Sequence, residues 1–154
     1  MSLEEFRQID SSILTVGKLI AMIARGQQIY LNHHLEGLGI NATQLHLLLE
    51  ISSQCDINQE SISRRCNINK GAVARSIKKL EDKGLVIRQI DENNRRQNKV
   101  SLTDLGRQTL NESMKILKDW EDEIILEKGY VERETLQKVL KEIAIKTMEL
   151  NQVS

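Results

Sequence analysis

One amphipathic segment, about residues 69–83, constrains the fold more than any other part of this chain, because it passes directly into two strand-like runs. Val73, Ile77 and Leu80 recur at three- and four-residue steps, which predicts a helix with one buried stripe and an opposite free face. That free face carries hydrogen-bond donors without a matching set of carboxylates: Lys70, Arg75, Ser76, Lys78 and Lys79. The segment is therefore predicted to pack on one side and to offer a basic surface on the other.

The sequence also marks the ends of this helix and the strands that follow it. Asn69 is a suitable N-cap, because its side-chain oxygen can accept a backbone N–H of the first turn. Gly84 stands where a left-handed residue would end the helix. Aliphatic runs at 85–88 and 100–103 flank the polar, basic stretch 91–98, which predicts a hairpin with that stretch at its tip. A capped basic helix followed by a basic hairpin is typical of a winged helix-turn-helix that binds DNA.

A second helix is predicted directly before the first one. Asn58 is suited to cap the segment 59–66, and the connection 67–69 is short enough to make the two helices a helix-turn-helix pair. The apolar residues spaced along this pair are expected to form its core: Ile57, Ile62, Cys66, Ile68, Val73, Ile77 and Leu80. The predicted fold class is mainly α, with a small β-hairpin wing.

Charge is distributed unevenly along the chain. The whole sequence has 22 Lys and Arg and 22 Asp and Glu, so its net charge argues neither for nor against nucleic acid. Residues 64–100 hold 11 basic and 4 acidic side chains, a net charge of +7, whereas residues 1–63 carry −4 and residues 101–154 carry −3. Positive charge concentrated on the predicted helix and hairpin is the electrostatic pattern of a phosphate-binding surface. The alternative for any one lysine is a solvated side chain without a partner.

Long helical patterns flank this lobe on both sides. The pattern from about 11 to 34 is apolar on more than one face, so the helix must be covered by its own domain and by something else. After Thr103, which is suited to cap a helix, such patterns continue on either side of a break at 127–129. We therefore expect N-terminal dimerisation at 1–36, a winged helix-turn-helix lobe at 37–103 with its recognition helix at about 69–83 and its wing at about 85–102, and C-terminal dimerisation helices at 104–154.

Several classes of protein are not predicted. No apolar run reaches the roughly 18 residues of a membrane-spanning helix, so a cytoplasmic protein without a membrane partner is expected. Cys55 and Cys66 are too few for a disulfide framework. His33 and His34 are adjacent and face different sides of a helix, so no metal site is predicted. Nothing resembles a nucleophile with its base, a phosphate-binding loop or paired carboxylates, so neither a cofactor nor an enzymatic activity is predicted.

These segments together resemble the MarR-type (multiple-antibiotic-resistance-type) transcriptional regulators. The resemblance rests on the order and spacing of residues 59–62, 70–75, 80–88 and 95–106, and it covers nearly the whole chain. It implies a homodimer intertwined through its N- and C-terminal helices that binds a pseudo-palindromic operator in double-stranded DNA. One recognition helix of each subunit would lie in the major groove, and the wing would lie in the adjacent minor groove.

Residue roles follow from the helix chemistry and from this resemblance. A guanidinium can bond guanine O6 and N7 together, so Arg75 is the first candidate for a base contact, with Ala72 and Ser76 beside it. The lysines are better suited to phosphate. The predicted DNA-binding residues are Lys70, Gly71, Ala72, Arg75, Ser76, Lys78, Lys79, Arg95 and Arg96. In the family wing an aspartate usually holds the minor-groove arginine, but Asn94 stands at that position and can only hydrogen-bond Arg96.

The resemblance also implies regulation by a small aromatic acid or phenolic compound. It places Arg25 of the first long helix near a ligand carboxylate, with Tyr30 and His46 as neighbours. The alternative is that Arg25 pairs with a glutamate of the partner subunit or extends to water. The function predicted is that of a repressor. An activator or ligand-independent DNA-binding protein of the same fold, and a winged-helix adaptor that binds other proteins, remain as alternatives.

Overall fold

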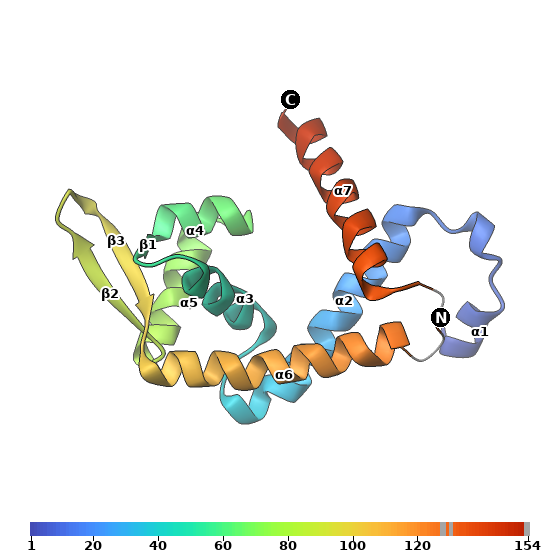
Figure 1. Cartoon of the computed structure of the whole chain (residues 1–154), viewed down its shortest axis with the longest axis horizontal. Coiled ribbons are helices and arrows are strands. Elements are labelled where there is room, and N and C mark those ends of the chain that lie inside the picture. Colours follow the sequence, from blue (N-terminus) through green and yellow to red (C-terminus); the bar gives the residue numbers. More distant parts are fainter. Residues whose placement is uncertain (127–128, 130, 153–154) are drawn as a thin grey trace. The chain divides into compact units, whose positions relative to one another are not determined.

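The computed structural model describes residues 1–126, 129 and 131–152, except for the side chains of Asp91, Leu126 and residues 94–97. It divides into two compact units, Met1–Ile116 and Leu117–Ser154, which are described separately. The first unit contains α1 (Leu3–Arg7), η1 (Ser11–Ile13), α2 (Val16–Leu35), η2 (Glu36–Leu38), α3 (Ala42–Ser53), β1 (Ile57–Asn58), α4 (Gln59–Cys66), α5 (Lys70–Asp82), β2 (Val86–Asp91) and β3 (Asn94–Leu102) (Figure 1). Helix α6 (Asp104–Leu126) begins in the first unit and ends in the second, which also holds α7 (Arg133–Gln152). The predicted fold class, mainly α with a small wing, is confirmed.

The beginning of the chain differs from the single helix that was expected from about residue 11. Asp10 caps the short 3-10 helix η1 by accepting a bond from the backbone N–H of Ser12 at 2.8 Å. Thr15 then caps α2 by accepting from the backbone N–H of Lys18 at 3.2 Å. The predicted start was wrong because the apolar spacing continues through both caps, whereas the backbone at Leu14 is extended.

The helix-turn-helix pair is set by side-chain caps at both of its helices. Asn58 accepts the backbone N–H of Ser61 at 2.7 Å, and Asn69 accepts that of Gly71 at 2.7 Å. Both predicted N-caps are confirmed. Between the helices, Asn67 adopts a left-handed conformation with φ of 51°. The turn is closed further by a bond from the backbone N–H of Ile68 to the carbonyl of Ser63 at 3.1 Å.

The core of the first unit lies among α2, α3, α4, α5 and the sheet. Its fully buried large side chains are Leu31, Leu35, Leu45, Leu47, Leu48, Ile51, Ile62, Val73, Ile77, Leu80 and Val100. Two residues expected in this core, Cys66 and Ile68, are only half-buried. Both line a surface groove of about 340 Å³ together with Thr43, His46, Leu49 and Glu50. Helical spacing located the correct face of α4, but it could not show that this edge of the face stays open.

The sheet has three antiparallel strands in the order β1-β3-β2. Val86 of β2 lies opposite Leu102, and the ladder continues to Asp91 opposite Asn94, with a register shift between Ile90 and Asp91. The prediction that residues 91–98 form the tip was wrong, because β3 already begins at Asn94. Polar side chains suit an exposed strand as well as a loop, so composition alone did not distinguish them. The hairpin extends away from the cluster of α3, α4 and α5 (Figure 1).

The base of the wing is joined tightly to the end of α5 and to the start of α6. Gly84 has φ of 72°, as predicted for the residue that ends the helix, and the backbone N–H of Leu85 bonds the carbonyl of Leu80 at 2.9 Å. Thr103 donates from Oγ1 to the Gly84 carbonyl at 2.6 Å and accepts from the backbone N–H of Gly106 at 2.9 Å. The predicted cap at Thr103 is therefore confirmed.

The second unit is held by ion pairs around the start of α7. Arg133 forms an ion pair with Asp122, and its Nη1 lies 3.5 Å from Oε2 of Glu121. Lys118 also forms an ion pair with Asp122. These two cations hold the pKa of Asp122 below its ordinary value, Lys118 contributing more through its hydrogen bond. Within the described part of the chain, no helix combines the length and the apolar character that crossing a membrane requires.

Candidate nucleic-acid interface

Helix α5 separates apolar and basic side chains cleanly between two faces. Val73, Ile77 and Leu80 are at most 1% exposed, so one stripe of the helix is closed off by the core. On the remaining surface Ala72 and Ser76 are half-buried, and the long basic side chains are exposed: Lys70, Arg75, Lys78 and Lys79. Because the core fixes the buried stripe, it also fixes the direction in which this basic face points. A rigid helix with one basic face is suited to the major groove of B-DNA.

Arg75 lies close to the first turn of its own helix. A Cβ placed on Gly71 would be 3.3 Å from Nη1 of Arg75 and 3.1 Å from Oδ1 of Asn69. Glycine at this position therefore leaves room for the guanidinium beside the N-cap. Within the part of the chain that the structure describes, neither Arg75 nor Lys79 forms an ion pair with a carboxylate. These two cations are therefore available to an external anion.

The other two predicted lysines of α5 are paired within the protein. Lys70 Nζ lies 3.2 Å from Oε1 of Glu60 on α4, and Lys78 Nζ lies 2.7 Å from Oδ1 of Asp82, one turn further along α5. The hydrogen bond to Asp82 is the main cause of a raised pKa at Lys78. A phosphate that reaches either lysine must therefore compete with a carboxylate. Sequence analysis did not identify Glu60 as part of this surface.

Two further basic residues fasten the lobe together. Arg88 of β2 pairs with Glu81 of α5, and both side chains are half-buried, so this ion pair joins the wing to α5. Lys83 donates from Nζ to the carbonyl of Gly39. Both cations contribute to the net charge of the segment, but their hydrogen-bonding groups have partners inside the protein.

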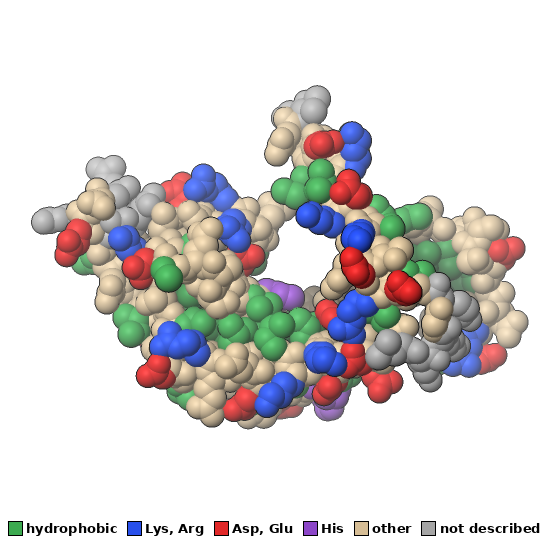
Figure 2. Space-filling model, in the orientation of Figure 1, with side chains coloured by type: hydrophobic (Ala, Val, Ile, Leu, Met, Phe, Trp, Pro, Cys, Tyr) green, Lys and Arg blue, Asp and Glu red, His purple; other side chains and the backbone are tan. Residues whose placement is uncertain are grey.

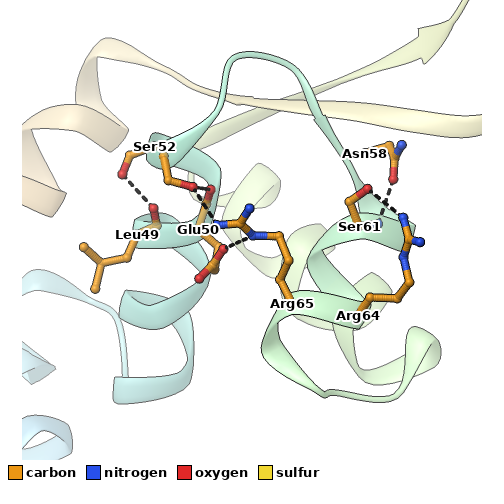
Figure 3. Close-up of polar contacts among 8 residues, drawn as sticks. Leu49, Glu50, Ser52, Asn58, Ser61, Arg64 and Arg65 are labelled. Atoms are coloured by element: carbon orange, nitrogen blue, oxygen red, sulfur yellow. Dashed lines mark hydrogen bonds and ion pairs between the residues drawn. The ribbon is translucent and has the colours of Figure 1, made fainter. Parts of the chain in front are cut away.

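Helix α4 carries two adjacent arginines that point to different neighbours (Figure 3). Arg65 donates from Nε to Oε2 of Glu50 on α3 at 2.6 Å. Arg64 donates to Oγ of Ser61 at 3.3 Å, next to the end of the helix that Asn58 caps. Arg65 therefore connects α3 to α4, whereas Arg64, in the last turn of α4, adds an exposed cation whose side chain reaches back to Ser61.

The wing prediction concerns side chains outside the described set. The backbones of Arg95 and Arg96 belong to β3, as does that of Asn94, which lies opposite Asp91 at the closed end of the hairpin. The side chains of these three β3 residues are not described. The role of the two arginines in the minor groove stays a prediction.

The predicted effector residues lie in two different settings. Arg25 is exposed on α2, and the half-buried Tyr30 stacks its ring on that of His34 at a centroid distance of 3.9 Å. His46 is exposed on α3 and lines the 340 Å³ groove, which neither Arg25 nor Tyr30 lines. In that groove, burial is the main cause that raises the pKa of the Cys66 thiol. Among the described residues, no three His, Cys, Asp or Glu side chains are grouped so that they could hold a metal ion.

Comparison with known proteins identifies the family. The MarR family model matches residues 40–97. An uncharacterized HTH-type transcriptional regulator of Bacillus subtilis, YdgJ, is 33% identical over 102 residues, which span 66% of this chain and 62% of that protein.

Two solved structures extend the likeness over most of the chain. The structure of a MarR transcriptional regulator from Methanosarcina mazei is 33% identical, with a TM-score of 0.77 over 90% of this chain and 98% of that one. A cysteine-to-serine variant of Escherichia coli MarR, complexed with operator DNA, is 27% identical, with a TM-score of 0.74 over 88% of this chain and 99% of that one. The chain belongs to the MarR family of DNA-binding transcriptional regulators.

Proposed function

We propose that this protein is a cytoplasmic repressor that binds a pseudo-palindromic operator as a homodimer and is released by a small aromatic or phenolic anion. One α5 helix of each subunit would enter the major groove, and the hairpin would reach the adjacent minor groove. The observation that carries the proposal is the division of α5 into a core-facing stripe and a basic outer face. A winged-helix adaptor for other proteins would not need this basic face.

We assign the roles on α5 from the contacts of each side chain. Arg75 is the candidate for reading guanine, because it is exposed and its guanidinium is not engaged by a carboxylate within the described residues. Lys79, exposed on the same helix, is the foremost candidate for phosphate. Ala72 and Ser76, both half-buried, border Arg75 and are placed to contact base edges at close range.

Exposed apolar side chains support the dimer. On α2 these are Val16, Ile20, Met22, Ile23 and Ile29, and on α7 they are Val139, Leu140, Ile143, Ile145, Met148 and Leu150. Hydrophobic side chains are visible on the surface of α7 in Figure 2. Ile23 is 57% exposed and Leu150 is 67% exposed, and a large exposed apolar surface of this kind is typical of a protein–protein contact. We propose that residues 1–36 and 104–154 form the dimer interface. Contact with a second copy would then remove these apolar side chains from water.

The test is a salt-dependent binding titration with a duplex from the region upstream of the protein's own gene and with an unrelated duplex. We expect selective binding whose affinity falls steeply with salt. Arg75→Ala should weaken binding of the selected duplex by about 1–3 kcal/mol and relax sequence preference. Lys138→Ala, which removes a cation that pairs with Glu134 on α7, is the matched control. Equal losses on both duplexes would make Arg75 a phosphate contact, and no binding at low salt would refute DNA binding itself.

The effector part of the proposal is tested separately. If Arg25, Tyr30 and His46 receive an aromatic acid, salicylate should weaken operator binding by the wild-type protein, because the ligand would favour a conformation that binds DNA less well. Arg25→Ala should reduce this response and leave binding without salicylate unchanged. An unaltered response in this variant would contradict the assignment of Arg25.

A further inference from the structure

The carboxylate of Glu60 occupies an unusual position for a DNA-binding surface. It lies in the first turn of α4, and its Oε1 is 3.2 Å from Nζ of Lys70, the first residue of α5. The carboxylate therefore belongs to the first turn of α4 and contacts a cation that extends from the first residue of α5. Backbone N–H groups at helix N-termini favour negative charge, so the fold stabilises a carboxylate at this place. The same kind of position attracts phosphate in other proteins.

Both partners of this pair remain accessible. The side chain of Lys70 is 73% exposed and that of Glu60 is 42% exposed, so neither is closed off by the core. Double-stranded DNA presents about one negative charge for every 1.7 Å of its axis. When the N-terminal end of α5 approaches DNA, Lys70 either leaves Glu60 for a phosphate or brings Glu60 toward the phosphates with it. In both cases a carboxylate comes close to the phosphate backbone, and repulsion opposes binding.

This repulsion does not act equally on all DNA sequences. Binding to nonspecific DNA depends almost entirely on phosphate contacts, so every register of a nonspecific complex meets the penalty. In an operator, base contacts fix one register, and a carboxylate can then accept a hydrogen bond from a cytosine amino group where the sequence supplies one. The carboxylate thus weakens binding in most registers and is compatible with binding in only a few.

We propose that Glu60 is a specificity-determining residue, which lowers affinity for nonspecific DNA by holding Lys70 and by repelling phosphate. The inference rests on the proposed function, because it requires that α5 binds DNA. In this proposal the α4–α5 pair both attracts DNA and limits binding to nonspecific sequences. Arg75 and Lys79 favour DNA, and Glu60 limits how much of that affinity is independent of sequence.

The experiment compares the wild-type protein with Glu60→Gln, which keeps the size of the side chain and removes its charge. Binding is measured by fluorescence anisotropy on the duplex that wild-type protein selects from a random pool and on an unrelated duplex. The control is Glu134→Gln on α7, which changes net charge equally and also removes the partner of an exposed lysine. Thermal unfolding of each variant is recorded to verify that the fold is retained.

We expect Glu60→Gln to bind the unrelated duplex about two- to fivefold more tightly, the range for one exposed ion pair. The selected duplex should change less, so the ratio of the two affinities should fall. In a Lys70→Met background the gain on unrelated DNA should shrink, because Glu60→Gln then relieves only the repulsion of phosphate and releases no Lys70 side chain. Equal gains on both duplexes, no gain on either, or a full gain in the Lys70→Met background would overturn the inference. If the wild-type protein bound no duplex, the proposed function would fail instead, so the two failures are distinguishable.

Discussion

Gly106 is the position where one added methyl group should be most damaging. A Cβ on this residue would overlap the carbonyl oxygen of Leu85 and lie 3.0 Å from its carbonyl carbon. That carbonyl cannot move freely, because it accepts the backbone N–H of Thr103 at 3.1 Å. Relief of the overlap therefore requires α6 to move away from the base of the wing.

The expected cost of Gly106→Ala can be estimated from these contacts. Overpacking of a tight site typically costs about 1–3 kcal/mol. Movement of α6 would also weaken two hydrogen bonds of Thr103, to Leu85 and to Gly84, at about 1 kcal/mol each. Alanine favours a helix over glycine by about 1 kcal/mol, which offsets part of the loss. We therefore expect the free energy of unfolding to fall by about 2–4 kcal/mol.

Urea denaturation measures this change. The protein concentration is kept fixed, because the proposed dimer would have an apparent stability that depends on concentration. With a slope of about 2 kcal/mol per molar urea, the midpoint should fall by about 1–2 M. Gly37→Ala is the control, since Gly37 has no heavy atom within 4 Å of an added Cβ, and its effect should stay within about 0.5 kcal/mol. An unchanged midpoint for Gly106→Ala would refute the close approach of α6 to Leu85.

Three further predictions test other contacts of the same lobe. Asn69→Ala removes the cap that accepts the backbone N–H of Gly71 at 2.7 Å and should lower the free energy of unfolding by about 1 kcal/mol in urea; no change would mean that the cap is replaced by water. Arg88→Met breaks the half-buried ion pair with Glu81 and should lower the thermal midpoint by an amount equivalent to about 1 kcal/mol; an unaltered midpoint would show that this pair does not stabilise the wing. Maleimide labelling near pH 7 should be slower at Cys66 in a Cys55→Ser protein than at Cys55 in a Cys66→Ser protein, because burial raises the pKa of the Cys66 thiol and keeps it protonated; the Cys66 rate should continue to rise at higher pH, and equal rates would contradict this.

The sequence correctly predicted those helix boundaries that are set by contacts between residues close together in the chain. The caps at Asn58, Asn69 and Thr103 were predictable because each cap bonds a backbone N–H only two or three residues ahead. Strand β1 was not predicted, since its two residues are too few to show alternation and pair only with the distant segment at Lys99 and Val100. The break before α2 was missed for a different reason: the caps at Asp10 and Thr15 are local, but the apolar spacing continues through them and was given more weight.

The basic surface was harder to predict than the fold, because it depends on contacts between residues distant in sequence. Counting charges treats Lys70 and Arg65 as equivalent to Arg75, although Lys70 is paired with Glu60 ten residues away and Arg65 with Glu50 fifteen residues away. A count of basic residues in the sequence therefore overestimates how many cations are available to bind phosphate. What distinguishes Arg75 and Lys79 is that the fold brings no carboxylate to them within the described residues. If α5 binds DNA as proposed, its selectivity depends on which cations the helix pair leaves without a carboxylate partner. The carboxylates that neutralise the other cations would then belong to the recognition surface as much as the arginine and lysines do.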